Sequence, residues 1–153
     1  MKQIFLVVFI LVFSPLTISS QSCLDEGITF TTQAQIDSFQ NNYPGCTEIE
    51  GNVTINESNI TNLNGLNMII AIGQSLDISY NVALTNLNGL NSLTSLINLS
   101  IDGNNMLTDL TGLDNVDGSS IAALYIMNNS SLSSCEAQCI CNFLANPQRG
   151  FIL

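Results

Sequence analysis

Apolar residues recur along this chain with a period of 23 to 25 residues. The clearest markers are four pairs of apolar residues two positions apart: Val53 and Ile55, Leu76 and Ile78, Leu99 and Ile101, and Leu124 and Ile126. Alternation of apolar and polar positions over such a short stretch is typical of a β-strand with one buried face. The pattern therefore predicts four equivalent short strands.

A longer motif repeats between these pairs. It reads ITNLNGL from Ile60, LTNLNGL from Leu84 and LTDLTGL from Leu107. Repetition every ~20 to 29 residues is the sequence signature of a leucine-rich-repeat-like solenoid, in which each unit buries its apolar side by stacking on its neighbours. We therefore expect a mainly β repeat solenoid with about four coils and a short helix capping each end.

Two small or polar columns repeat with the motif. One holds Gly65, Gly89 and Gly112, and there we expect a positive φ, which glycine adopts at little cost. The other holds Asn81, Asn104 and Asn129, each three residues after the second apolar position of a strand. We expect their stacked amides to satisfy backbone groups inside the turn.

The front cap is predicted from a capping box. Thr32 and Gln35 have the required spacing, Ile36 and Phe39 would form the apolar face of the helix, and a Pro-Gly pair at Pro44 would end it. The rear cap follows the same logic.

At the back, Ser133 and Glu136 have the spacing of a second capping box. The helix that they predict should run to about Ala145, because Pro147 cannot continue it. Each end of the stack would then be closed by a helix.

The first 20 residues have the layout of a secretory signal peptide, with Lys2, an apolar run over 4–13 and cleavage near Ser20. The alternative, a membrane anchor, would need a longer run to cross a bilayer about 30 Å thick. Residues 21–153 then form one domain, with a front cap (21–48), repeats (49–132) and an incomplete rear cap (133–153). Lipidation of Cys23 stays open, although the Leu that bacterial lipoprotein signals prefer is missing before it.

Five cysteines leave one without a partner. In an exported protein, we expect Cys23 and Cys46 to form a disulfide. Cys135, Cys139 and Cys141 pair poorly within one helix, which leaves open a Cys135–Cys139 pair at a distorted first turn or a partner beyond the chain. A metal site is not expected, because these cysteines offer no fourth ligand and the sequence has no histidine.

Together the motifs resemble a known family. GITFTTQAQIDSFQNNYPGCTEIEGNVTI, the LTNLNGL repeats and SLSSCEAQCICNFLANP are similar to sequences of the receptor L-domain, leucine-rich-repeat-like proteins that bacteria export. The resemblance spans Cys23 to about Pro147. It implies a right-handed β-helix-like fold, a secreted or cell-surface location, and a binding or adhesion role without catalytic residues. Similar proteins continue beyond RGFIL, so it also implies a truncated member.

The charge distribution excludes several classes of function. All twelve Asp and Glu residues follow residue 20, where Arg149 is the only basic residue. Such a chain repels polyanions, so we expect no nucleic-acid partner, and no membrane insertion after signal cleavage. Histidine is absent and Lys2 is the only lysine, so the commonest general base and any Schiff-base lysine are missing from the mature chain. We expect no enzyme activity and no cofactor.

The outward face of the strands is the candidate binding surface, because repeat proteins commonly bind partners there. Its predicted residues are Asp77, Ser79, Tyr80, Ser100, Asp102, Tyr125 and Met127. Exposed tyrosines often anchor interfaces. Two aspartates on adjacent strands would also have the spacing of a glycoside hydrolase pair, but a solvated strand face often carries carboxylates.

We therefore predict a non-catalytic, exported module at the cell surface or outside the cell, which binds an unidentified protein or glycan. The alternative is a structural spacer, or a fragment of a larger surface protein, with no ligand of its own. In that case the strand face is an ordinary polar surface.

Overall fold

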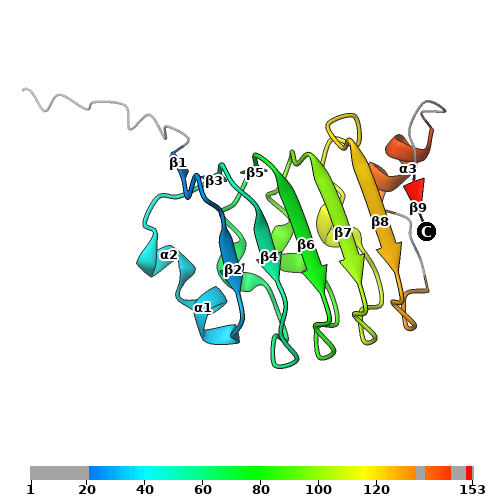
Figure 1. Cartoon of the computed structure of the whole chain (residues 1–153), viewed down its shortest axis with the longest axis horizontal. Coiled ribbons are helices and arrows are strands. Elements are labelled where there is room, and N and C mark those ends of the chain that lie inside the picture. Colours follow the sequence, from blue (N-terminus) through cyan, green and yellow to red (C-terminus); the bar gives the residue numbers. More distant parts are fainter. Residues whose placement is uncertain (1–20, 134–136, 146–150, 153) are drawn as a thin grey trace, which may run out of the picture.

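The computed structural model describes residues 21–133, 137–145 and 151–152. The predicted signal peptide (1–20), Cys135, Glu136 and Arg149 lie outside these residues. The described residues form two parallel β-sheets, three short α-helices and three 3-10 helices (Figure 1).

The larger sheet forms one broad face of the molecule (Figure 1). Its strands, all parallel, follow in the order β2 (Ile28–Phe30), β4 (Val53–Ile55), β6 (Ser75–Ser79), β7 (Asn98–Asp102), β8 (Ala123–Met127) and β9 (Phe151–Ile152). Leu76 pairs with Leu99, and Leu99 pairs with Leu124. Strand register therefore follows the repeat, which confirms the alignment predicted from the sequence.

A smaller sheet and a row of 3-10 helices complete the repeats. The smaller sheet has three parallel strands, β1 (Ser22–Cys23), β3 (Glu48–Ile49) and β5 (Ala71–Ile72). The 3-10 helices are η1 (Asn64–Leu66), η2 (Asn88–Leu90) and η3 (Thr111–Leu113), and each contains the end of one repeated motif. Beyond β5, a single bridge between Ala71 and Ser95 continues the smaller sheet.

The prediction of a mainly β solenoid is wrong. The described residues form an α/β fold, in which two parallel sheets are joined by helical and turn segments, rather than a solenoid built from sheet alone. The difference arises in the return segments. The backbone N–H of Leu66 donates to Leu63 at 2.9 Å, and that of Leu90 donates to Leu87 at 2.8 Å. These bonds stay within one repeat, so they form 3-10 turns instead of a ladder between repeats.

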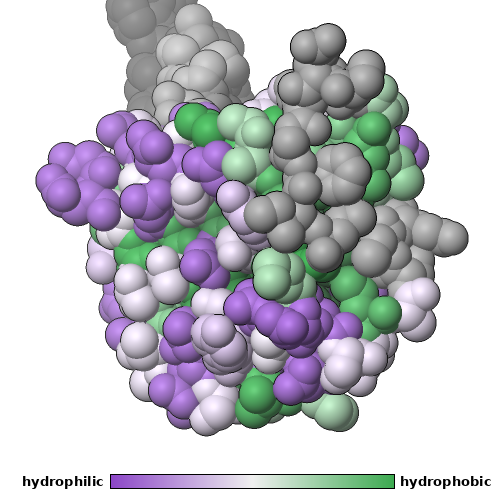
Figure 2. Space-filling view, turned by 45° about the vertical axis from the view of Figure 1, so that its right-hand side comes forward, coloured by the Kyte–Doolittle hydropathy of each residue, from purple (hydrophilic) through white to green (hydrophobic). Residues whose placement is uncertain are grey.

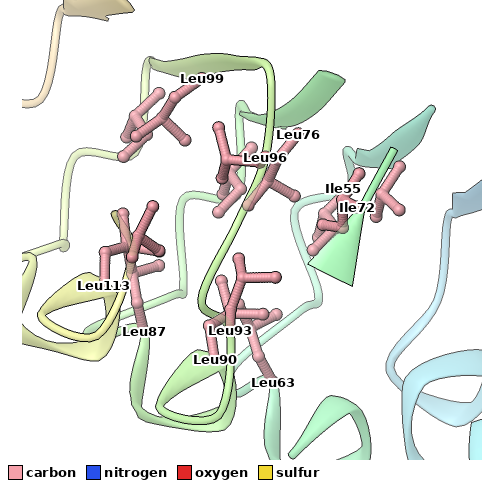
Figure 3. Packing of buried hydrophobic residues seen from close by; sticks show 14 of the residues in the cluster. Ile55, Leu63, Ile72, Leu76, Leu87, Leu90, Leu93, Leu96, Leu99 and Leu113 are labelled. Atoms are coloured by element: carbon pink, nitrogen blue, oxygen red, sulfur yellow. The ribbon is translucent and has the colours of Figure 1, made fainter. Parts of the chain in front are cut away.

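The core lies between the larger sheet and the 3-10 helices. Figure 3 shows Leu76 and Leu99 from the larger sheet pointing into the same interior as Leu87 and Leu90 from the opposite side. These four side chains are no more than 1% exposed. Burial of one leucine contributes roughly 1.5–3 kcal/mol, so the repeated apolar columns stabilise the stack as the sequence predicts.

The predicted positive φ at the repeated glycines is wrong. Among the described residues, the glycines with positive φ are Gly27, Gly45 and Gly103. The repeated glycines instead lie where two repeats approach closely. A Cβ on Gly89 would lie 1.9 Å from the Leu63 carbonyl oxygen, because successive 3-10 helices stack directly on one another. Glycine is required there for lack of space.

The front cap matches its prediction in part. α1 (Gln33–Asp37) begins with the expected capping box, in which the Thr32 hydroxyl accepts from the Gln35 backbone and the Gln35 side chain accepts from the Thr32 backbone. Phe39 is buried as predicted. The helix is interrupted at Ser38, however, and continues as the short α2 (Phe39–Asn42).

The predicted capping box of the rear helix is wrong. α3 (Gln138–Leu144) begins after Ala137, which makes no side-chain capping bond, so Ser133 lies well before the helix. Glu136, the second member of that box, lies outside the described residues. Ala145 is the C-cap, which confirms the predicted end of the helix.

The front cap is also held by the predicted disulfide. Cys23 and Cys46 are bonded, with their Cα atoms 5.7 Å apart. A structural disulfide is consistent with an extracellular protein. Within the described part of the chain, no helix is long and apolar enough to cross a membrane.

Candidate functional site

The outward face of the larger sheet carries two rows of predicted site residues. Asp77, Ser100 and Tyr125 lie side by side on β6, β7 and β8. In the next outward row, Ser79 pairs with Asp102 and Asp102 pairs with Met127. Their neighbours along each strand are buried core residues, so alternation directs these side chains away from the core. The parallel register thus brings the predicted residues onto one face.

These residues are not equally accessible. Tyr80 is 58% exposed, Tyr125 is 44% exposed and Met127 is 40% exposed. Ser79 is 7% exposed and therefore offers little contact area to a partner, contrary to its predicted role. Large side chains thus dominate what the strand face presents. Figure 2 shows hydrophilic and hydrophobic residues interspersed over the visible surface, rather than one continuous apolar patch.

Tyr80 has an unusual backbone conformation. It follows β6 with a φ of 57°, and the equivalent residues after β7 and β8, Gly103 and Asn128, have φ values of 69° and 55°. The fold thus requires the left-handed conformation at this column. Gly and Asn adopt it readily, whereas a bulky side chain does so at a cost. The sequence analysis missed this feature, although a column containing Gly and Asn was a signal for it.

The Tyr80 ring lies over Gly103. A Cβ on that glycine would lie 2.8 Å from Cδ1 of the ring and 3.0 Å from Cε1. The pKa of Tyr80 is raised, first by a hydrogen bond to the Asp102 side chain, then by the negative charge of Asp102, with smaller contributions from desolvation and from Asp77. Glycine on one side and a carboxylate at the hydroxyl therefore fix the orientation of an exposed ring.

Asp102 connects the ring to the next strand. Nδ2 of Asn128 donates to Oδ1 of Asp102 at 2.8 Å, a contact that the sequence analysis did not anticipate. On the neighbouring strand, Oδ1 of Asp77 is buried and has no hydrogen-bond partner among the described residues. Asp77 and Asp102 occupy diagonal positions on adjacent strands, which places them roughly 7–8 Å apart. One carboxylate is thus held in place, and the other keeps an unused acceptor.

The turn below the strand face is held by the predicted asparagine ladder. Nδ2 of Asn104 donates to the Ile78 carbonyl at 2.8 Å and to the Asp102 carbonyl at 3.1 Å. Asn81 makes the equivalent bonds to Ile55 and to Ser79. Each amide therefore fixes the carbonyl at the end of a strand. The ladder is confirmed, and it holds the backbone just before and after Tyr80.

The electrostatics of the face are one-sided. Both basic residues of the chain, Lys2 and Arg149, lie outside the described residues, and the sequence has no histidine. Within the described ranges, no three side chains of the types His, Cys, Asp and Glu gather to hold a metal ion. The carboxylates on the strand face therefore have no cationic partner in this part of the chain.

Two features lie away from the strand face. A hollow of about 280 Å³ between the edge strand β2 and the front helices is lined by Ile28, Thr29, Phe30, Gln35, Asn42 and Tyr43. On the rear helix, Cys139 is buried and Cys141 is exposed, and burial raises the pKa of the Cys139 thiol to about 11. No sequence motif marks the hollow, because separate elements contribute its lining. Cys135 lies outside the described residues.

Comparison with known proteins adds no assignment to this geometry. No protein-family model matches the chain, and no curated protein is similar to it.

Proposed function

We propose that this protein is an exported, non-catalytic binding module that uses the outward face of β6, β7 and β8 to hold a protein or glycan at a cell surface. Tyr80 carries the proposal. The fold requires a left-handed residue at this position, which glycine or asparagine fills at lower cost. An exposed aromatic ring stands there instead, fixed against Gly103 and Asp102. A costly residue with an exposed side chain is best explained by contact with a partner.

The composition of the face supports binding. Tyr80, Tyr125 and Met127 together present a large apolar area, with carboxylates between them. Interfaces of this kind combine aromatic anchors with polar groups that set orientation. The described carboxylates stand on an open sheet rather than in a cleft, which favours recognition over catalysis.

Export is supported by three observations. The first 20 residues have a signal-peptide layout, the Cys23–Cys46 disulfide suits an oxidising environment, and the motifs resemble those of exported receptor L-domain proteins. The alternative, a spacer without a ligand, gives no account of the exposed ring at Tyr80.

The test is a binding screen of the full chain against glycan arrays and cell-surface protein fractions. A triple variant, Tyr80→Ala/Asp102→Ala/Tyr125→Ala, removes the proposed contacts. The matched control is Glu26→Ala/Met68→Ala/Leu144→Ala, which also removes one acidic and two large apolar exposed side chains, but none from β6, β7 or β8. Circular dichroism establishes that all three proteins are folded.

We expect the wild type and the control variant to bind the same ligand, and the strand-face variant to bind it at least ~10-fold more weakly, because hot-spot residues carry most of an interface's energy. Equal loss in both variants, or a folded wild type that binds nothing, would reject the proposal in favour of the spacer. Turnover of a labelled oligosaccharide would contradict the non-catalytic assignment.

A further inference from the structure

We propose that the strand face recognises an arginine side chain of a partner protein, stacked on the Tyr80 ring and reaching the carboxylates of Asp77 and Asp102. This inference rests on the proposed binding function and specifies the chemistry of the ligand. It commits to a basic protein segment rather than to a glycan.

The first argument is the geometry of the ring. One face of the Tyr80 ring lies against Gly103, where even a Cβ would come within 2.8 Å. The side chain is nevertheless 58% exposed, so its accessible area lies away from that glycine. A planar guanidinium stacks on such a ring through both dispersion and cation–π attraction.

The second argument is the supply of acceptors. Asp102 already accepts from Asn128 and interacts with the Tyr80 hydroxyl, but a carboxylate has lone pairs for further donors. Oδ1 of Asp77 has no partner among the described residues. Guanidinium carries five N–H donors in a planar fork, which suits simultaneous stacking and bonding to carboxylates. A lysine ammonium supplies only three donors and no plane to stack.

The third argument is charge complementarity. No lysine, arginine or histidine stands among the described residues, so a cation that neutralises this face has to come from a partner. The small side chain of Ser100 separates Asp77 from Tyr125 in the same row, which leaves space above β7. Two exposed aromatic residues thus flank a row of acceptors that the protein itself does not neutralise.

The test uses three capped pentapeptides as probes, identical except for a central arginine, lysine or citrulline. Citrulline keeps the planar shape of arginine but has no charge. Binding to the ¹⁵N-labelled full chain is measured by chemical-shift titration at low and at high salt. Asp102→Asn and Tyr80→Gly are the test variants, and Glu26→Gln, an exposed carboxylate before β2, is the matched control.

We expect saturable shifts centred on the ends of β6 and β7 with the arginine peptide. Affinity should fall at least ~10-fold for citrulline and severalfold for lysine, in both test variants, and at high salt, while the control variant binds like the wild type. Equal binding of arginine and citrulline peptides, shifts elsewhere on the chain, or no binding to the wild type would overturn the inference.

The two proposals fail separately. A surface ligand that the strand-face triple variant loses, but that the arginine peptide does not displace, would leave the binding function standing and reject the arginine site. An oligosaccharide that stacks on the ring would be such a ligand. If the triple variant keeps the ligand, the binding function itself fails.

Discussion

The backbone N–H of Asn81 donates to the side-chain oxygen of Asn104 at 3.0 Å, and so joins the turns that follow β6 and β7. The same amide of Asn104 donates in the opposite direction to the Ile78 carbonyl. One buried side chain therefore satisfies backbone groups of two successive repeats. This arrangement links the stability of the stack to the position of the strand face.

Asn104→Ala should lower the free energy of unfolding by about 3 kcal/mol or more, because it leaves one buried N–H and two carbonyls unpaired at about 1–3 kcal/mol for each. Urea denaturation measures the change. Asn105→Ala is the control, since this neighbouring asparagine is exposed. Similar midpoints for the two variants would show that the ladder adds little to stability.

Gly89→Ala should destabilise the fold by about 2 kcal/mol or more, although alanine normally favours helical backbone. The new Cβ would lie 1.9 Å from the Leu63 carbonyl oxygen and force the 3-10 helices apart. Asn91→Ala, at an exposed position just after the same 3-10 helix, should change stability by less than about 0.5 kcal/mol. A neutral or stabilising Gly89→Ala variant, measured in the same denaturant series, would contradict the close packing.

Reduction of the Cys23–Cys46 disulfide should cost about 3 kcal/mol, because it frees a loop whose ends are 23 residues apart. The measurement compares urea midpoints with and without dithiothreitol. A Cys23→Ser/Cys46→Ser variant should start at the lower midpoint and not respond to reductant. A wild type that is equally insensitive to reductant would mean that this bond does not stabilise the front cap.

The two described cysteines of the rear helix should differ in reactivity. Cys141 is exposed and should react with a maleimide in the native protein at pH 8, whereas buried Cys139 should react only after unfolding. Peptide mapping by mass spectrometry identifies the labelled residue. Labelling of Cys139 at the rate of Cys141 would contradict its burial.

Stability should also depend on pH through Cys139. Its pKa rises from 9.0 to about 11 in the folded protein, so above pH 9 the unfolded state loses the thiol proton first. Stability is therefore lost as the pH rises from 9 towards 11. Cys139→Ala should flatten this part of the profile, and an unchanged profile would assign the loss to other groups.

The repeat predicted the register of the larger sheet, its core and the asparagine ladder, because these depend on spacing that every repeat shares. The return segments were harder to predict. Whether Leu66 donates within its own repeat or to the next depends on the distance between repeats, which the pattern does not contain. Gly89 shows the same limit, since its pattern fits both a positive φ and a close approach.

The candidate site was predictable only in outline. Alternation placed Asp77 and Tyr125 on one face, because it is a local property of a strand. The contact between Asp102 and Asn128 joins two neighbouring repeats beyond the strand ends, and it depends on the left-handed turn that follows β8. Sequence spacing alone does not determine that geometry.

The most direct test of the account is a Tyr80→Gly substitution, assayed for both stability and ligand binding. Glycine suits the left-handed position, so the urea midpoint should stay within about 1 kcal/mol of the wild type, whereas Tyr125→Gly in β8 should destabilise the sheet. Binding of the ligand identified in the screen should fall at least ~10-fold in the folded Tyr80→Gly protein. Unchanged binding by that stable variant would contradict the claim that the strand face binds through Tyr80.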